Sequence, residues 1–154
     1  MKKVLLTLAL SLGLIGTASA IEVGVNGGGI SGGNAGGVAG VTVGEQFGKF
    51  NVTAGFARGW QDVTTTDRWT LVGGYDVANV AGITVTPKIG YAYLSNSSTT
   101  LANSTPSSSA GLVGFGLTYP VTKQVSATAD YAYQFSSNSN NTGNVLTVGL
   151  KYRF

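Results

Sequence analysis

The side chains that could do chemistry in this sequence are few, and the most reactive groups are missing. The 154 residues include neither histidine nor cysteine, so Ser/His and Cys/His nucleophile pairs cannot form, nor can metal sites built on those ligands. Asp62 and Asp67 are one possible carboxylate pair, in the segment QDVTTTD. Among threonines and without further oxygen ligands, they are better interpreted as solvated acids than as a calcium site. The sequence therefore predicts no enzyme, no cofactor and no metal.

A second set of charges stands one residue away from large apolar side chains, inside stretches where apolar and polar residues alternate. Such charges share a face with Gly, Ala, Ser and Thr. Both signs are present, so the set could form ion pairs, and unpaired buried charge is very costly. Its members are Glu22, Asp76, Lys88, Asp130, Lys151 and Arg153.

The first twenty residues read as a secretion signal. Lys2 and Lys3 precede an apolar run over residues 4–15, and Ala18 and Ala20 stand at the −3 and −1 positions of a cleavage site after Ala20. The alternative is an uncleaved anchor, but the apolar run is shorter than the ~20 residues of a spanning helix. We expect residues 21–154 to form one domain, with scattered charges and no basic patch that would suggest a nucleic-acid partner.

Alternation with a period of two runs through these residues and predicts strands, whereas helical periodicity is missing. We predict eight strands, at residues 21–30, 37–45, 49–60, 68–77, 82–94, 111–121, 124–135 and 145–154. The connections alternate between long polar segments and tight ones such as EQFGK, ANVAG and VTKQ. The fold class is therefore all-β: an eight-stranded antiparallel up-and-down transmembrane β-barrel with long extracellular loops and short periplasmic turns.

An eight-stranded barrel can hide its apolar face inside, as soluble lipocalin-like barrels do, or turn it outward to lipid. The small face favours the second arrangement, because eight strands leave only a narrow interior. Aromatic residues also gather toward the strand ends, as membrane interfaces favour. Those toward the long loops are Trp60, Trp69, Tyr91, Tyr93, Tyr131, Tyr133 and Phe135; those toward the short turns are Phe47, Phe50, Tyr75, Tyr119, Tyr152 and Phe154.

The signal sequence, the eight amphipathic strands and the terminal GLKYRF resemble the small OmpA/OmpX-like outer-membrane β-barrels of Gram-negative bacteria. That resemblance implies the cell outer membrane, with its lipid and lipopolysaccharide, as the location of a monomer. It also implies that Val148, Leu150, Tyr152 and Phe154 form the C-terminal signal read by the barrel-assembly machinery. Pro87 departs from the pattern, because a closed barrel has no free edge for a residue without N–H. We expect a bulge or a shifted boundary there.

Three functions remain open. The favoured hypothesis is a non-enzymatic outer-membrane protein with a structural or surface-interaction role through its extracellular loops. The alternative is a narrow passive porin-like channel, which an ion network that includes Glu22–Arg153 would plug. A lipid-modifying enzyme is disfavoured because histidine is missing. The charge-free segment 95–110 is either a neutral surface loop or a contact for a receptor, a phage or a host surface.

Overall fold

The computed structural model describes residues 20–32, 36–61, 64–98, 107–136 and 142–154. Every regular element in these ranges is a β-strand, and none of them contains a helix long and apolar enough to cross a membrane. In chain order the strands are β1 (Ala20–Gly32), β2 (Gly36–Phe47), β3 (Phe50–Gln61), β4 (Thr64–Tyr75), β5 (Ala78–Val80), β6 (Ile83–Ser98), β7 (Ser108–Pro120), β8 (Val125–Ser136) and β9 (Gly143–Arg153).

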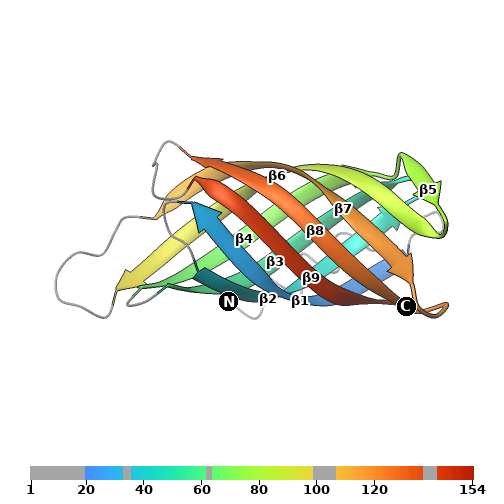
Figure 1. Cartoon of the computed structure of the whole chain (residues 1–154), viewed down its shortest axis with the longest axis horizontal. Coiled ribbons are helices and arrows are strands. Elements are labelled where there is room, and N and C mark those ends of the chain that lie inside the picture. Colours follow the sequence, from blue (N-terminus) through green and yellow to red (C-terminus); the bar gives the residue numbers. More distant parts are fainter. Residues whose placement is uncertain (1–19, 33–35, 62–63, 99–106, 137–141) are drawn as a thin grey trace.

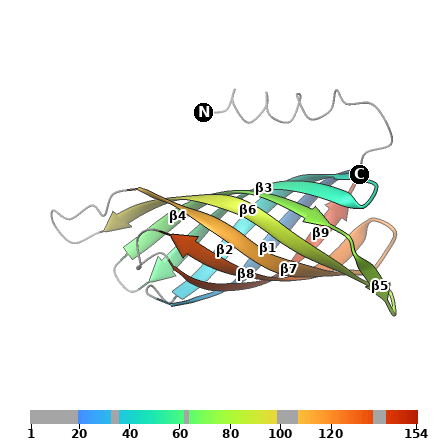
Figure 2. The same cartoon turned by 90° about the horizontal axis from the view of Figure 1, so that it is seen from above.

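The strands form one closed antiparallel barrel. Each strand pairs with its neighbour in sequence, β1 pairs with β9, and β4 also pairs with β6. The short β5 pairs only with β6, and it continues along β6 where the pairing of β4 ends. β4 and β5 together therefore occupy one of the eight strand positions around the barrel. Figures 1 and 2 show the tilted strands wrapping around a long axis, with the C-terminus at the same end as β5. The predicted all-β, eight-stranded up-and-down barrel is confirmed.

All eight predicted strands are present, but several reach further than expected. β4 begins at Thr64, four positions before the predicted start at residue 68, and β6 continues to Ser98. β-branched threonines favour strands, and Thr64, Thr65 and Thr66 pair with both β3 and β6. Only residues 33–35 separate β1 from β2, and only 62–63 separate β3 from β4. These two connections are shorter than expected, and residues 99–107 and 137–142 make the longer ones.

The register of pairing with β6 changes near Pro87, where a bulge or a shifted boundary was expected. Gly74 pairs with Lys88, but the next pair toward the turn is Ala78 with Val85. Residues 75–77 therefore stand opposite only Thr86 and Pro87, which is the one-residue excess of a bulge. The expected bulge is present, and it lies on the strand facing the proline.

The hairpin from β5 to β6 turns through Ala81 and Gly82, which both have positive φ, 51° and 84°. Two successive residues in this region match the tight turns that best suit the twist of antiparallel strands. This turn, the turn between β2 and β3 and the turn between β7 and β8 lie at the end of the barrel where the chain terminates. We call this end the short-turn end.

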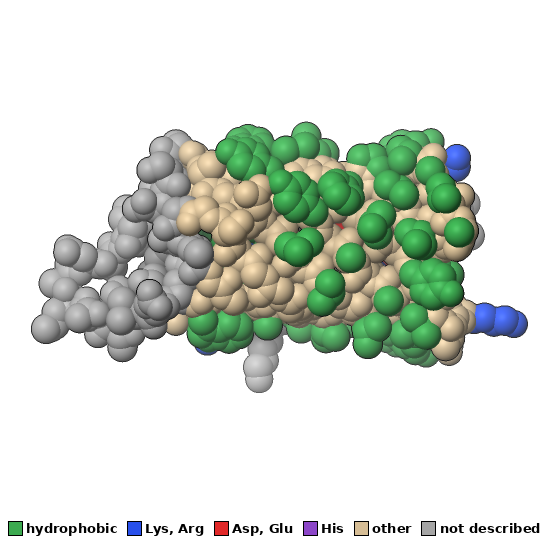
Figure 3. Space-filling view, viewed as in Figure 1, with side chains coloured by type: hydrophobic (Ala, Val, Ile, Leu, Met, Phe, Trp, Pro, Cys, Tyr) green, Lys and Arg blue, Asp and Glu red, His purple; other side chains and the backbone are tan. Residues whose placement is uncertain are grey.

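Large apolar side chains cover the outside of the barrel. Val25, Leu71, Ile89 and Leu150 are each more than half exposed, and Figure 3 shows apolar side chains spread along the visible wall. Aromatic residues of neighbouring strands meet on this surface, as in Phe50–Tyr75 and Phe56–Trp69, with ring centroids 4.7 Å apart in both pairs. The apolar face therefore points outward, as the sequence predicted.

Candidate functional site

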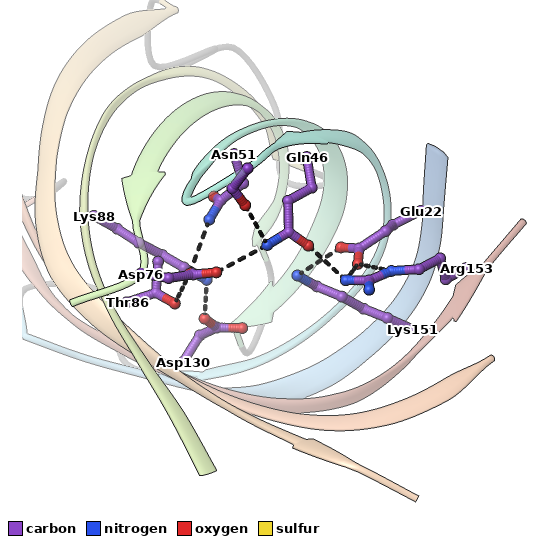
Figure 4. A network of polar contacts seen from close by, with 10 residues as sticks. Glu22, Gln46, Asn51, Asp76, Thr86, Lys88, Asp130, Lys151 and Arg153 are labelled. Atoms are coloured by element: carbon purple, nitrogen blue, oxygen red, sulfur yellow. Dashed lines mark hydrogen bonds and ion pairs between the residues drawn. The ribbon is translucent and has the colours of Figure 1, made fainter. Parts of the chain in front are cut away.

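The inward face of the barrel carries most of its charged side chains. The six charges singled out in the sequence point into the lumen, and Arg68 joins them because it alternates with the exposed Trp69 and Leu71. Six of these seven charges lie toward the short-turn end, where Figure 4 shows them meeting with three neutral polar residues. We call this group the polar network: Glu22, Gln46, Asn51, Asp76, Thr86, Lys88, Asp130, Lys151 and Arg153.

Glu22 is the centre of one half of the polar network. It stands directly opposite Arg153 in the pairing of β1 with β9, where the barrel closes. Nη2 of Arg153 donates to Oε1 of Glu22 at 2.6 Å, Nε donates to the same oxygen at 3.0 Å, and Nζ of Lys151 lies 3.4 Å from Oε2. The structure thus brings Glu22, Lys151 and Arg153 together, and one carboxylate accepts from two cations.

Asp76 is the centre of the other half and has neutral partners. Thr86 Oγ1 donates to its Oδ1 at 2.6 Å, Gln46 Nε2 donates to Oδ2 at 2.9 Å, and Asn51 Nδ2 lies 3.4 Å from Oδ1. Asp76 was expected to pair with a cation, and among the described residues it forms no salt bridge. Arg153 Nη2 also donates to Gln46 Oε1, so this amide joins the two carboxylate centres.

Lys88 and Asp130 form a third contact across the lumen, from β6 to β8. Gly116 on β7 lies beneath this pair, and an added Cβ would stand 2.4 Å from Asp130 Oδ1 and 2.6 Å from Lys88 Nζ. The missing side chain at position 116 gives the pair its space. The close approach therefore explains why position 116 is a glycine.

An apolar layer lies in the lumen toward the other end of the barrel, beside the buried polar residues Thr66 and Gln134. Ala92, Leu94, Ala110 and Leu112 are almost completely buried and pack together with the partly buried Val72. Val38 and Val145 are buried at the same end of their strands. Between this layer and the polar network lies a cavity of about 150 Å³, lined by residues of both.

The residues expected to form the assembly signal occupy the outer face of β9 and the chain end. Val148, Leu150, Tyr152 and Phe154 are all exposed, and the rings of Tyr152 and Phe154 lie 4.9 Å apart. The Phe154 N–H donates to the carbonyl of Ile21 at 3.0 Å, so the last residue is held against β1. Of the two expected cleavage-site residues, Ala18 lies outside the described residues and Ala20 begins β1.

Of the two carboxylates first weighed for catalysis, Asp62 lies outside the described residues and Asp67 lies within them. Asp67 accepts from Arg58 Nε at 2.7 Å and from Nη2 at 2.9 Å, on the outer face of β3 and β4. Within the described ranges no cluster of three or more His, Cys, Asp or Glu side chains could hold a metal.

Sequence reasoning missed Arg68 and the three neutral members of the polar network, Gln46, Asn51 and Thr86. A signal for Arg68 was available, because its position alternates with Trp69 and Leu71 just as that of Asp76 alternates with Tyr75 and Val77. No comparable signal marks the neutral residues, since inward Gln, Asn and Thr side chains are ordinary in a polar lumen.

Comparisons with known proteins identify the architecture. No protein-family model matches the sequence, and no curated protein sequence matches it. Among solved structures, Neisserial surface protein A matches with a TM-score of 0.73 and 14% identity, over 90% of this chain and 98% of that one.

Two further solved structures show the same likeness. The N-terminal β-barrel domain of Pseudomonas aeruginosa OprF matches with a TM-score of 0.69 and 16% identity, over 88% of this chain and 97% of that one. Ail, the attachment invasion locus protein of Yersinia pestis, gives a TM-score of 0.58 and 16% identity over the same shares. The chain therefore has the eight-stranded barrel fold of these small outer-membrane proteins.

Proposed function

We propose that this protein is a non-enzymatic outer-membrane β-barrel, which acts as a scaffold with a structural or surface-interaction role through its extracellular loops. The observation that carries the proposal is the inverted barrel: large apolar side chains face outward, while most of the charged side chains point into the lumen, where Lys88–Asp130 and Arg153–Glu22 form ion pairs. A water-soluble barrel would have the opposite arrangement, because exposed apolar area is unfavourable in water.

The outer membrane is the location that best suits this surface. The exposed aromatic residues lie toward both ends of the strands, where the interfaces of a bilayer would be, with Trp60 and Phe135 at one end and Phe50 and Tyr119 at the other. The predicted signal sequence would carry the chain across the inner membrane. Outer-membrane lipid and lipopolysaccharide are then its surroundings.

The final strand is the part of the chain that a partner would recognise during biogenesis. We propose that Val148, Leu150, Tyr152 and Phe154 are recognised by the barrel-assembly machinery before β9 closes against β1. Their side chains share one exposed face, so an extended segment of this kind can present all four to a partner at once. A Phe154→Ala variant should accumulate less folded barrel than the matched Phe154→Tyr variant, which keeps the aromatic ring.

A surface role rests on the connections at the end away from the short turns. The longest connection between consecutive strands joins β6 to β7, and its residues 99–106 are rich in Ser, Thr and Asn. Binding often concentrates in loops that a rigid scaffold presents. One similar protein, Ail, has been solved with the heparin analogue sucrose octasulfate. An epitope inserted in residues 99–106 should bind antibody on intact cells; binding only after lysis would contradict the extracellular placement.

The channel alternative is disfavoured by what fills the lumen. An apolar layer occupies part of the lumen at one end, and the ion pairs of the polar network cross it at the other. In planar bilayers we expect no reproducible single-channel openings from the purified protein. Clear openings of constant size would favour the porin-like channel instead.

The location is tested by fractionation combined with gels of boiled and unboiled samples. We expect the protein in the outer-membrane fraction, with a mobility that changes on boiling because the folded barrel resists the detergent of the gel. A soluble periplasmic protein without any mobility change would contradict the proposal.

A further inference from the structure

Arg68 is a buried cation without a protein partner. Its residue is 6% exposed, and its side chain lines the lumen cavity from β4. Among the described residues its side chain forms no hydrogen bond and no salt bridge, and its Nε is both buried and unsatisfied. Its cross-strand neighbours are Leu94 on β6 and Ala57 on β3, which offer no acceptor side chain.

The carboxylates of the lumen are not available to Arg68. Glu22 accepts from Arg153 and Lys151, Asp130 from Lys88, and Asp76 from the neutral donors of the polar network. Four cations therefore face three carboxylates across the described lumen. One positive charge remains without a counter-charge, and it belongs to the residue beside the apolar layer.

Such an arrangement is costly in an empty lumen. A guanidinium taken out of water needs acceptors for its five donors and a compensating charge, or the barrel loses several kcal/mol. Water alone would supply acceptors but no charge. The cavity of about 150 Å³ beside Arg68 is large enough for several particles of water size, each of which occupies about 30 Å³ in the liquid.

We propose that this cavity is a binding site for one monovalent anion of halide size, held by the guanidinium of Arg68. Thr70, Thr128 and Thr147 also line the cavity, and their hydroxyl groups can donate to an anion or to its remaining waters. Lys88, Lys151 and Asp130 line it as well, and the Asp130 carboxylate is already paired with Lys88. One negative charge balances the single unpaired cation, which is why a monovalent ion fits better than sulfate or phosphate. The site is internal, so it is independent of any surface role of the loops.

Diffraction from crystals grown in sodium bromide locates the ion directly. We expect an anomalous peak inside the lumen, within hydrogen-bond distance of the Arg68 guanidinium. The peak should be absent in an Arg68→Met variant, which keeps most of the side-chain length without charge. It should remain in the matched Lys123→Met variant, which removes an exposed cation from the turn at residues 121–124. A wild-type lumen without bromide beside Arg68 would overturn the proposal.

Thermal unfolding of the purified protein gives the second test, in sodium chloride and in sodium lactobionate at equal concentration. Lactobionate has the size of a disaccharide and cannot enter the cavity. Chloride should raise the wild-type midpoint by roughly 4 °C for each tenfold increase above its dissociation constant. Arg68→Met should respond equally to both salts and should be at least as stable as wild type in lactobionate, because it removes the unpaired charge. Arg68→Lys should keep a weaker response to chloride. Identical salt responses of wild type and Arg68→Met would refute the site.

Discussion

The two ends of the narrow lumen contain different kinds of side chain: charged and polar at one end, largely aliphatic at the other. Toward the short turns, charged side chains fill the space and satisfy one another, and they stay partly hydrated: the side chains of Lys88 and Asp130 are 23% and 27% exposed. Toward the other end, aliphatic residues pack together and are almost completely buried, with Ala92 0% exposed and Leu94 3% exposed. Charge is tolerated where water and partners both reach it, and Arg68 lies just beyond that region.

This difference has an energetic meaning. The apolar layer stabilises the barrel by close packing, so its contribution depends on volume. The polar network contributes less by attraction than by avoiding the penalty of unpaired charge, so its contribution depends on every member being present. Each end should therefore respond to a different kind of substitution.

The largest effect is expected from Leu112→Ala in the apolar layer. Removal of a buried leucine side chain leaves a cavity and should lower the free energy of unfolding by about 3 kcal/mol. Denaturant unfolding of the purified barrel measures it. The matched control is Leu146→Ala on the outer face, where lipid or detergent replaces the lost atoms and the cost should stay below about 1 kcal/mol. Equal losses in the two variants would show that the layer is not tightly packed.

A smaller loss is expected from Glu22→Gln in the polar network. The substitution keeps the shape but leaves Lys151 and Arg153 without their carboxylate. Breaking a buried pair costs about 3–5 kcal/mol, and partial hydration of this site reduces the expected loss to about 2 kcal/mol. The control is Asp67→Asn in the exposed Arg58–Asp67 pair, where we expect a loss below about 1 kcal/mol. If both substitutions cost the same under denaturant, the inner network has no special role.

The smallest effect concerns the neutral donors around Asp76. Thr86→Val removes the hydroxyl that donates at 2.6 Å while Gln46 and Asn51 remain, so the unfolding free energy should fall by about 1 kcal/mol. Thr118→Val is the control, because this threonine lies beside the polar network and makes no side-chain hydrogen bond in the part of the chain that is described. A loss of similar size for Thr118→Val would mean that lumen hydroxyl groups matter through hydration rather than through Asp76.

The inward placement of the six charges could be predicted, because alternation along a strand decides the face of every residue. The neighbourhood of Glu22 and Arg153 was also accessible, since one opens the first strand, the other closes the last, and a barrel must bring these strands together. Asp76 shows the limit of this reasoning. Its donors Gln46 and Asn51 lie 30 and 25 positions earlier in the chain, and which polar side chains meet across the lumen depends on how the strands are staggered.

The sequence by itself determined the eight strand positions around the barrel, the two faces of each strand and the absence of histidine and cysteine chemistry, because these depend on residue order and type alone. Only the tertiary structure decided the position of each inward side chain along the barrel axis. Strand tilt and stagger place Leu94 and Leu112 in one layer and gather Glu22, Lys88 and Asp130 at the other end. They leave Arg68 beside a cavity whose lining carboxylate, Asp130, is already paired with Lys88. Partners in a barrel lie across the lumen, so they are set by closure rather than by local sequence.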